Sequence, residues 1–228
     1  MYDDIDDIEN SSKYLDQLLI LNKYYLDEKE RNLYMIITKK KYNLIKKKLN
    51  ILREKQYYNN PNIITTYIKE NILANELAKV EMELRDFCQD VVNNIENVVY
   101  NLTNEDNDSL IFFQKLKADF LKYLLDLVDD DEDKLSIENE CQAMYQASYE
   151  LCNYLSPYSP LVLSTILNYS VFLYHVNNDT QLALDIADSG YTNCILALNG
   201  RMHDKVNYII NIIQENMETW KKELALKK

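Results

Sequence analysis

The sequence predicts an all-α fold, and three observations support that prediction. Only 2 Gly and 3 Pro occur in 228 residues, so the turn residues that a many-stranded β fold needs are missing. Apolar residues recur at helical spacing, as in the segment that carries Leu77, Val80, Leu84 and Phe87. The polar breaks between such segments are short, which favours antiparallel neighbours. We therefore expect about eight or nine antiparallel helices.

Eight segments carry the helical pattern, in chain order: 11–25, 28–56, 66–101, 109–128, 135–155, 160–177, 180–198 and 204–224. Asn59-Asn60-Pro61 separates the second segment from the third. Pro160 stands near a helix start, where its missing N–H costs little. Asn199-Gly200 suits a helix end, because glycine supplies the left-handed conformation. A helical repeat of about 34 residues is an alternative, but no repeating pattern of small and large residues supports it.

The charge pattern restricts the class of partner. The chain has 25 Lys and Arg against 37 Asp and Glu, a net charge of −12. Such a chain is a poor general binder of nucleic acid or of an anionic membrane. Between Lys39 and Lys55 the sign reverses, with eight basic residues. An acidic chain with one basic face indicates a local anion site. RNA contact or a localisation signal is disfavoured, because no aromatic base-stacking pattern accompanies the lysines.

Other motifs point to a cytoplasmic protein without catalysis. The first residues show no signal-peptide pattern, and no apolar run approaches the ~18 residues that cross a bilayer. Only His175 and His203 occur, without a glycine-rich phosphate loop, GxSxG or HExxH. We therefore predict no enzyme, no cofactor, no metal site and no membrane insertion. The widely spaced thiols are expected to fill the core of a reduced protein: Cys88, Cys141, Cys152 and Cys194.

Six segments, in order, resemble motifs of the 14-3-3 family. They are Glu30–Leu33 (ERNL), Glu83–Val91 (ELRDFCQDV), Ile111–Leu124 (IFFQKLKADFLKYL), Tyr145–Tyr149 (YQASY), Pro160–Tyr174 (PLVLSTILNYSVFLY) and Asn216–Trp220 (NMETW). The resemblance implies a single domain over residues 1–228, with nine antiparallel helices forming a concave groove. It also implies an adaptor that binds phosphoserine or phosphothreonine segments of partner proteins.

The resemblance assigns the phosphate to a basic cluster and a tyrosine hydroxyl: Lys39, Lys46, Lys115, Lys122 and Tyr123. Spacing agrees with this, since Lys39 and Lys46 are seven residues apart, as are Lys115 and Lys122, and so share a helix face. Asp119 is placed to pair with both lysines of the second pair. Without the resemblance, a lysine run is typical of a solvated face. The adjacent lysines are expected to face solvent: Lys40, Lys41, Lys47 and Lys48.

The opposite wall of the implied groove comes from two later helices. Its residues are Leu167, Asn168, Val171 and His175, followed by Ile212, Asn216 and Thr219. The two asparagines match family residues that hydrogen-bond the peptide backbone, and an amide can serve both N–H and C=O groups. The apolar members would contact apolar side chains of the ligand, although ordinary core packing is the alternative. Trp220 is expected in the core.

Several positions depart from the family pattern. An Arg–Arg–Tyr phosphate triad becomes Lys46, Lys122 and Tyr123, and a further family arginine is Asn50. Lysine is a point charge, whereas arginine grips phosphate with a planar fork. We therefore expect weakened phosphate affinity. A helical scaffold for unphosphorylated partners is the alternative function.

The regions that form the family's dimer interface also differ. The arm at residues 1–26 is short, and the connection from Arg53 to Glu83 is long. Apart from these two regions, the acidic tail of the family is absent after Trp220. We expect a homodimer with altered geometry.

Overall fold

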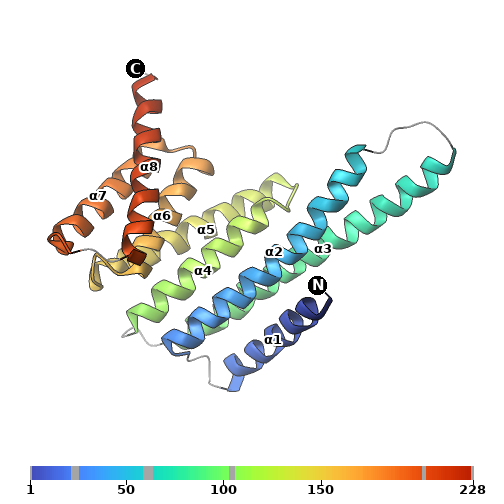
Figure 1. Cartoon of the computed structure of the whole chain (residues 1–228), viewed down its shortest axis with the longest axis horizontal. Helices are drawn as coiled ribbons and strands as arrows, with labels where there is room; N and C mark the ends of the chain where they lie inside the picture. Colours follow the sequence, from blue (N-terminus) through green and yellow to red (C-terminus); the bar gives the residue numbers. More distant parts are fainter. Residues whose placement is uncertain (1, 22–25, 59–63, 103–105, 202–203, 227–228) are drawn as a thin grey trace. The chain divides into compact units, whose positions relative to one another are not determined.

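The all-α prediction is confirmed by a computed structural model that describes residues 2–21, 26–58, 64–102, 106–201 and 204–226. These residues form eight α-helices and one 3₁₀ turn, without a strand (Figure 1). The eight helices correspond in order to the eight predicted segments. The chain divides into two compact units. The N-terminal unit is Met1–Asn101 with Asp126–Val128, and the C-terminal unit is Leu102–Leu125 with Asp129–Lys228. The single domain over 1–228 stays a prediction.

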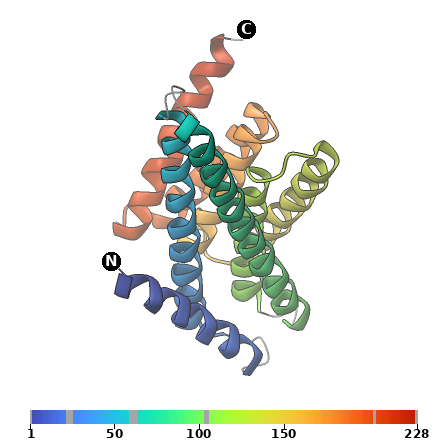
Figure 2. The same cartoon turned by 90° about the vertical axis from the view of Figure 1, so that its right-hand side faces the viewer.

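The N-terminal unit contains three helices: α1 (Tyr2–Leu21), α2 (Glu28–Tyr58) and α3 (Ile64–Asn101). The helices α2 and α3 form a long hairpin, and α1 packs against α2 (Figures 1 and 2). A reciprocal capping box starts α2, because the Glu30 amide donates to Asp27 Oδ1 (2.8 Å) and the Asp27 amide donates to Glu30 Oε2 (2.9 Å). The predicted break at Asn59-Asn60-Pro61 lies outside the described residues.

The C-terminal unit is built around α4 (Asn107–Leu125). Its other elements are α5 (Asp131–Leu151), the 3₁₀ turn η1 (Cys152–Tyr154), α6 (Pro160–His175), α7 (Thr180–Leu198) and α8 (Asp204–Leu226). The helix α4 packs against α5 and α6, and α6 packs against α7 and α8. Pro160 occupies the first turn of α6, as predicted. Asn199 (φ 47°) and Gly200 (φ 79°) end α7 in the left-handed conformation.

The core of the C-terminal unit is built largely on α4. Ile111, Phe113 and Phe120 are fully buried on this helix. Trp220 of α8 is 3% exposed, so its predicted core position is confirmed. None of the described helices has the length and apolarity needed to cross a membrane.

The four cysteines are free and buried, as the sequence predicted. Burial raises the pKa of the Cys88 and Cys152 thiols to about 12. Because the thiolate is the reactive form, these thiols are protonated and inert at neutral pH.

Gly190 permits close packing of α7 on α6. A Cβ atom at this position would lie 2.5 Å from Ile166 Cδ1 and 2.8 Å from Ile166 Cγ2. Since Ile166 is only 4% exposed, it has little room to move aside. We expect Gly190→Ala to destabilise the protein, because overpacking costs about 1–3 kcal/mol and outweighs a helix-propensity gain of about 1 kcal/mol.

A double-mutant cycle tests this explanation. In an Ile166→Ala background the clash is gone and only the propensity gain remains, so Gly190→Ala should become stabilising there. Urea unfolding of the four proteins measures both effects. If Gly190→Ala has the same effect in both backgrounds, contact with Ile166 does not explain the glycine.

Candidate functional site

The structure places the predicted site residues on four helices. Lys39 and Lys46 lie on α2 of the N-terminal unit. The C-terminal unit holds the rest: Lys115, Lys122 and Tyr123 on α4; Leu167, Asn168, Val171 and His175 on α6; Ile212, Asn216 and Thr219 on α8. Each unit is described separately.

Lys46 is held by a neutral group. Its Nζ donates to the Tyr42 hydroxyl one turn earlier (2.9 Å). Tyr42 is 4% exposed. Burial raises its pKa far above the ordinary value, and the nearby Cys88 and Asp126 groups raise the pKa further. The phenol therefore remains uncharged, and it orients the Lys46 ammonium without neutralising it. Lys39, two turns before Lys46, is half-buried.

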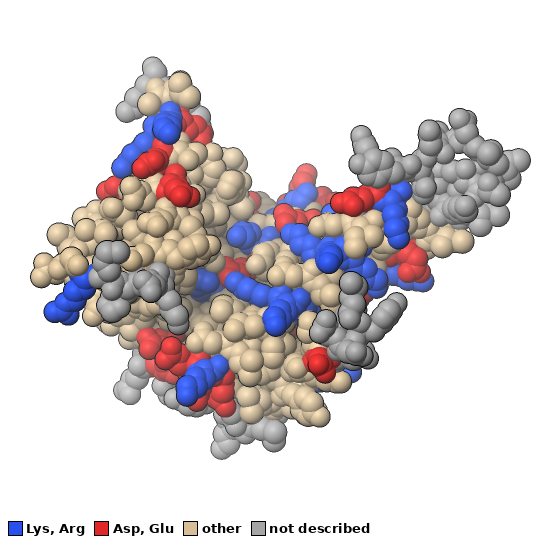
Figure 3. All heavy atoms as spheres, in the orientation of Figure 1, with Lys and Arg blue, Asp and Glu red and all other residues tan. Residues whose placement is uncertain are grey.

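Several other cations of α2 lie against acidic or aromatic side chains. Lys48 pairs with Glu83 (3.3 Å) and Arg53 pairs with Glu81 (2.8 Å). The Lys41 ammonium lies over the Phe87 ring, 4.8 Å from its centre. Basic side chains therefore gather along the α2–α3 hairpin beside acidic ones (Figure 3). The lysines adjacent to Lys39 and Lys46 are expected to face solvent. This is confirmed for Lys40, Lys47 and Lys48, which are exposed.

Two of the three α4 lysines are neutralised by carboxylates. Lys115 Nζ lies 3.3 Å from Asp119 Oδ2, and Lys117 Nζ lies 2.7 Å from Glu140 Oε1. Both lysines are buried, and a buried ammonium requires such a partner. Lys122 is half-exposed and makes no ion pair with any residue that the structure describes. Asp119 thus pairs with Lys115, as expected, but not with Lys122.

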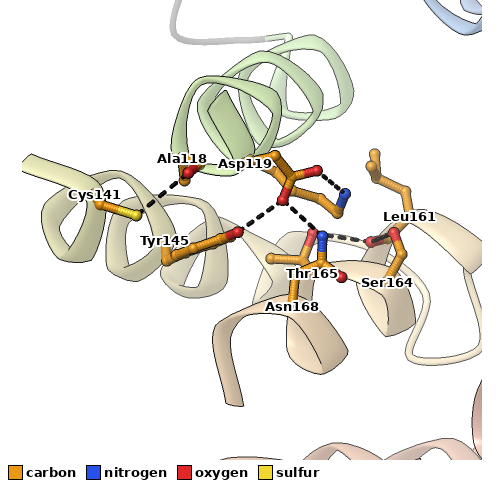
Figure 4. Close-up of polar contacts among 9 residues, drawn as sticks. Ala118, Asp119, Cys141, Tyr145, Leu161, Ser164, Thr165 and Asn168 are labelled. Carbon is orange, nitrogen blue, oxygen red and sulfur yellow. Dashed lines mark hydrogen bonds and ion pairs between the residues drawn. The ribbon is translucent and has the colours of Figure 1, made fainter. Parts of the chain in front are cut away.

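Asp119 also accepts the hydrogen bonds of a buried polar network, which the sequence did not reveal (Figure 4). The Tyr145 hydroxyl and Asn168 Nδ2 each donate to Asp119 Oδ1 at 2.7 Å. Asp119 is 2% exposed and Tyr145 is fully buried. Burial and then the Asp119 charge raise the Tyr145 pKa well above its ordinary value, so the phenol remains a donor. The network joins α4, α5 and α6 at a candidate groove residue.

The groove residues of α6 and α8 are mostly half-buried, as expected for a surface that binds a chain. This holds for Leu167, Asn168, Val171, Ile212 and Asn216, whereas His175 and Thr219 are exposed. The Thr219 hydroxyl donates to the Glu215 carbonyl of its own helix (3.0 Å). The His175 ring lies edge-on to the Tyr174 ring (4.7 Å between centres), and Tyr174 packs on Trp220 (5.3 Å).

The arrangement offers binding chemistry. Lys122 and Tyr123 are consecutive residues of α4, and the Tyr123 ring packs edge-on against Phe120 (5.3 Å). A lysine supplies three donors and a phenol one, which together suit the oxygens of an anion. Half-buried amides and aliphatic side chains on α6 and α8 suit a peptide backbone and its apolar side chains.

Comparison with known proteins shows the family. The family model described as 14-3-3 protein matches residues 1–221. Relatives include the 14-3-3 protein beta/alpha-1 of Oncorhynchus mykiss (29% identical over 68% of this chain and 64% of that protein). Another is the 14-3-3 protein theta of Gallus gallus, which is 29% identical over 69% of this chain and 65% of that protein. The 14-3-3-like protein 2 of Caenorhabditis elegans is 28% identical over 69% of this chain and 64% of that protein. The chain therefore spans slightly less than two thirds of these relatives' length.

The family model covers nearly the whole chain, including α2, α4, α6 and the part of α8 that carries the candidate site residues. The chain belongs to the 14-3-3 family.

Proposed function

We propose that the protein is a non-catalytic adaptor that binds phosphoserine or phosphothreonine segments of partner proteins. The supporting observation is the pattern of charge pairing. Lys46 and Lys122 have no carboxylate partner among the described residues. In contrast, the nearby Lys48 and Lys117 each pair with a glutamate. The Tyr42 hydroxyl orients Lys46, and Tyr123 follows Lys122 directly on α4. Cations held in place but not neutralised are what a phosphate site requires.

The chemistry of each contact follows from these residues. A phosphoryl group carries close to two negative charges at pH 7 and three acceptor oxygens. Lys39, Lys46 and Lys122 would donate to those oxygens as cations, with Tyr123 as a neutral donor. Lys115 is engaged with Asp119, so its contribution is long-range. The amides of Asn168 and Asn216 would bind the ligand backbone.

A phosphopeptide array tests this proposal. Each peptide is spotted in phosphorylated and unphosphorylated form, and the full chain is applied at several salt concentrations. We expect binding to a subset of phosphorylated spots only, weakening as salt rises. Binding to the two forms alike would contradict a phosphate requirement.

A scaffold for unphosphorylated partners is the second candidate. It is favoured by the lysines that replace the family arginines. One of the three N–H donors of Lys46 already binds the Tyr42 hydroxyl, which leaves two for a phosphate. Such a scaffold would bind the same peptides irrespective of phosphate, and salt would have little effect.

We also infer self-association through the N-terminal unit. The helices α1 and α2 border an apolar depression of about 410 Å³, whose lining includes Leu15, Leu18 and Ile37. Tyr14 and Leu33 beside it are 73% and 49% exposed. A second copy that covers these side chains would remove apolar area from water. The long connection between Arg53 and Glu83 supports a geometry that differs from the usual family dimer.

Sedimentation velocity at micromolar concentration tests this inference. We expect a dimer for the natural protein and a shift to monomer for Leu18→Glu. Glu54→Lys, an exposed charge change on α2, is the control and should stay dimeric. A natural protein that sediments only as a monomer would refute self-association, and a structure that superposes on the usual family dimer would refute altered geometry.

A further inference from the structure

A small pocket lies in the C-terminal unit, between the end of α5 with η1, the first half of α6 and the middle of α7. Its volume is about 140 Å³. Since a protein cavity of about 150 Å³ can hold one benzene molecule, this pocket is large enough for a single aromatic ring. None of the candidate phosphate-binding or groove residues lines it.

The floor of the pocket is buried and apolar. Cys152, Val162 and Ile166 line it, and each is at most 8% exposed. The Cys152 thiol donates to the Ser148 carbonyl (3.3 Å) and remains uncharged at neutral pH. Gly190 adds bare backbone to the floor, because it has no side chain. These groups together offer an apolar surface to the face of a ring.

The mouth of the pocket is polar but carries no charge. Asn153, Ser189 and Asn193 line the pocket and are exposed. The Ser189 hydroxyl and the Asn193 amide make no hydrogen bond with any described residue. Both can therefore bond the polar edge of a ligand. A charged ligand would lose water there without meeting a counter-charge, because the described residues that line the pocket are all neutral.

We propose that this pocket binds a small uncharged aromatic ring that carries hydrogen-bonding groups on its edge. The ring packs on the apolar floor, and its edge bonds the amide and hydroxyl groups at the mouth, the arrangement typical of small-molecule sites. A packing defect would be an apolar void, whereas polar side chains line this pocket. The proposal is independent of the proposed function, because Ile166 lines the pocket while the next residues of α6, Leu167 and Asn168, are candidates for the groove.

The two glycines of the chain provide a local probe of the pocket. Gly190 lines it, whereas a Cβ atom at Gly200 would meet nothing within 4 Å. Labelling the full chain with ¹⁵N-glycine gives two backbone amide signals. Gly200→Asn assigns them by removing one, since asparagine tolerates the left-handed conformation of that position.

The ligands are benzamide, benzoate and benzamidine, which share one ring and differ in charge. We expect benzamide to shift the Gly190 signal in a saturable titration and to leave the Gly200 signal in place. Benzoate and benzamidine should bind at least tenfold more weakly, because the pocket offers neither ion a counter-charge. Equal affinity for the three compounds, or no saturable Gly190 shift with benzamide, would overturn the proposal.

Substitutions on the exposed side of α7 locate the ligand. Asn193→Phe fills the mouth and removes the amide, whereas Thr192→Phe places the same ring at the next residue, which is exposed and does not line the pocket. We expect the benzamide titration of Gly190 to be lost in Asn193→Phe and retained in Thr192→Phe. Equal binding in both variants, or equal loss, would overturn the location.

Ser189→Ala and Asn193→Ala test the polar mouth. The loss of one neutral hydrogen bond weakens binding by roughly twofold to tenfold, and we expect a loss of this size in at least one of the two variants. Benzamide binding that is unchanged in both would mean that the apolar floor acts alone, which contradicts the proposed ligand chemistry.

Discussion

Lys46→Glu is expected to reduce phosphopeptide affinity by more than a hundredfold. Loss of one charge-assisted hydrogen bond costs about 1.5–3 kcal/mol, or roughly tenfold to a hundredfold in affinity. The glutamate then adds repulsion, because it brings a like charge towards a dianion. Isothermal calorimetry on one phosphopeptide measures the loss.

Lys47→Glu is the matched control, since it makes the same charge change at the next, exposed position of α2. We expect it to cause only a small loss that disappears at high salt. The converse variant, Lys46→Arg with Asn50→Arg, should bind more tightly than the natural protein, because it restores planar donors and adds a charge. Equal losses for Lys46→Glu and Lys47→Glu would show that only net charge matters and that Lys46 has no specific role.

Asp119→Ala is expected to lower the free energy of unfolding by about 3–5 kcal/mol, the cost of breaking a buried charge pair. The substitution leaves the Lys115 ammonium without this partner, and Lys115 is 7% exposed. It also removes the acceptor of the Tyr145 hydroxyl and of Asn168. Urea unfolding measures the change.

Asp188→Ala is the control for this effect. Asp188 pairs with Lys221 at 3.5 Å, but both side chains are more than half exposed. An exposed pair of this kind contributes about 0–1 kcal/mol. If Asp119→Ala were as mild as Asp188→Ala, the buried network would contribute little to stability, and α4, α5 and α6 would be held by apolar packing alone.

The helices could be predicted from the sequence, because their signals are local. Apolar spacing, Pro160 and Asn199-Gly200 each act within a few residues. The start of α1 was misplaced for a related reason. Apolar spacing marks the turns that pack on α2 and suggested a start at residue 11, whereas the helix extends from Tyr2. A helix continues past its packed turns while nothing breaks it, and residues 2–21 contain no Gly or Pro.

The candidate site could be predicted only in part. The pairing of Lys115 with Asp119 follows from a spacing of four on one helix. In contrast, Asp119 meets Tyr145 across 26 residues and Asn168 across 49, and such contacts are created by the packing of α5 and α6 on α4. The Lys117–Glu140 pair and the contact of Gly190 with Ile166 have the same origin. Sequence therefore suggested which residues bind, and packing determines which of them are already engaged.

The most direct test of the proposed function is calorimetry of the full chain with one array-selected phosphoserine peptide and its unphosphorylated twin, in the same buffer and at two salt concentrations. We expect measurable binding of the phosphopeptide, weaker at the higher salt concentration, and at least tenfold weaker binding of the twin, the minimum loss for one charge-assisted hydrogen bond. Equal affinity for the two peptides would mean that the fold persists without a phosphate site, and the scaffold function would then replace the phosphopeptide adaptor.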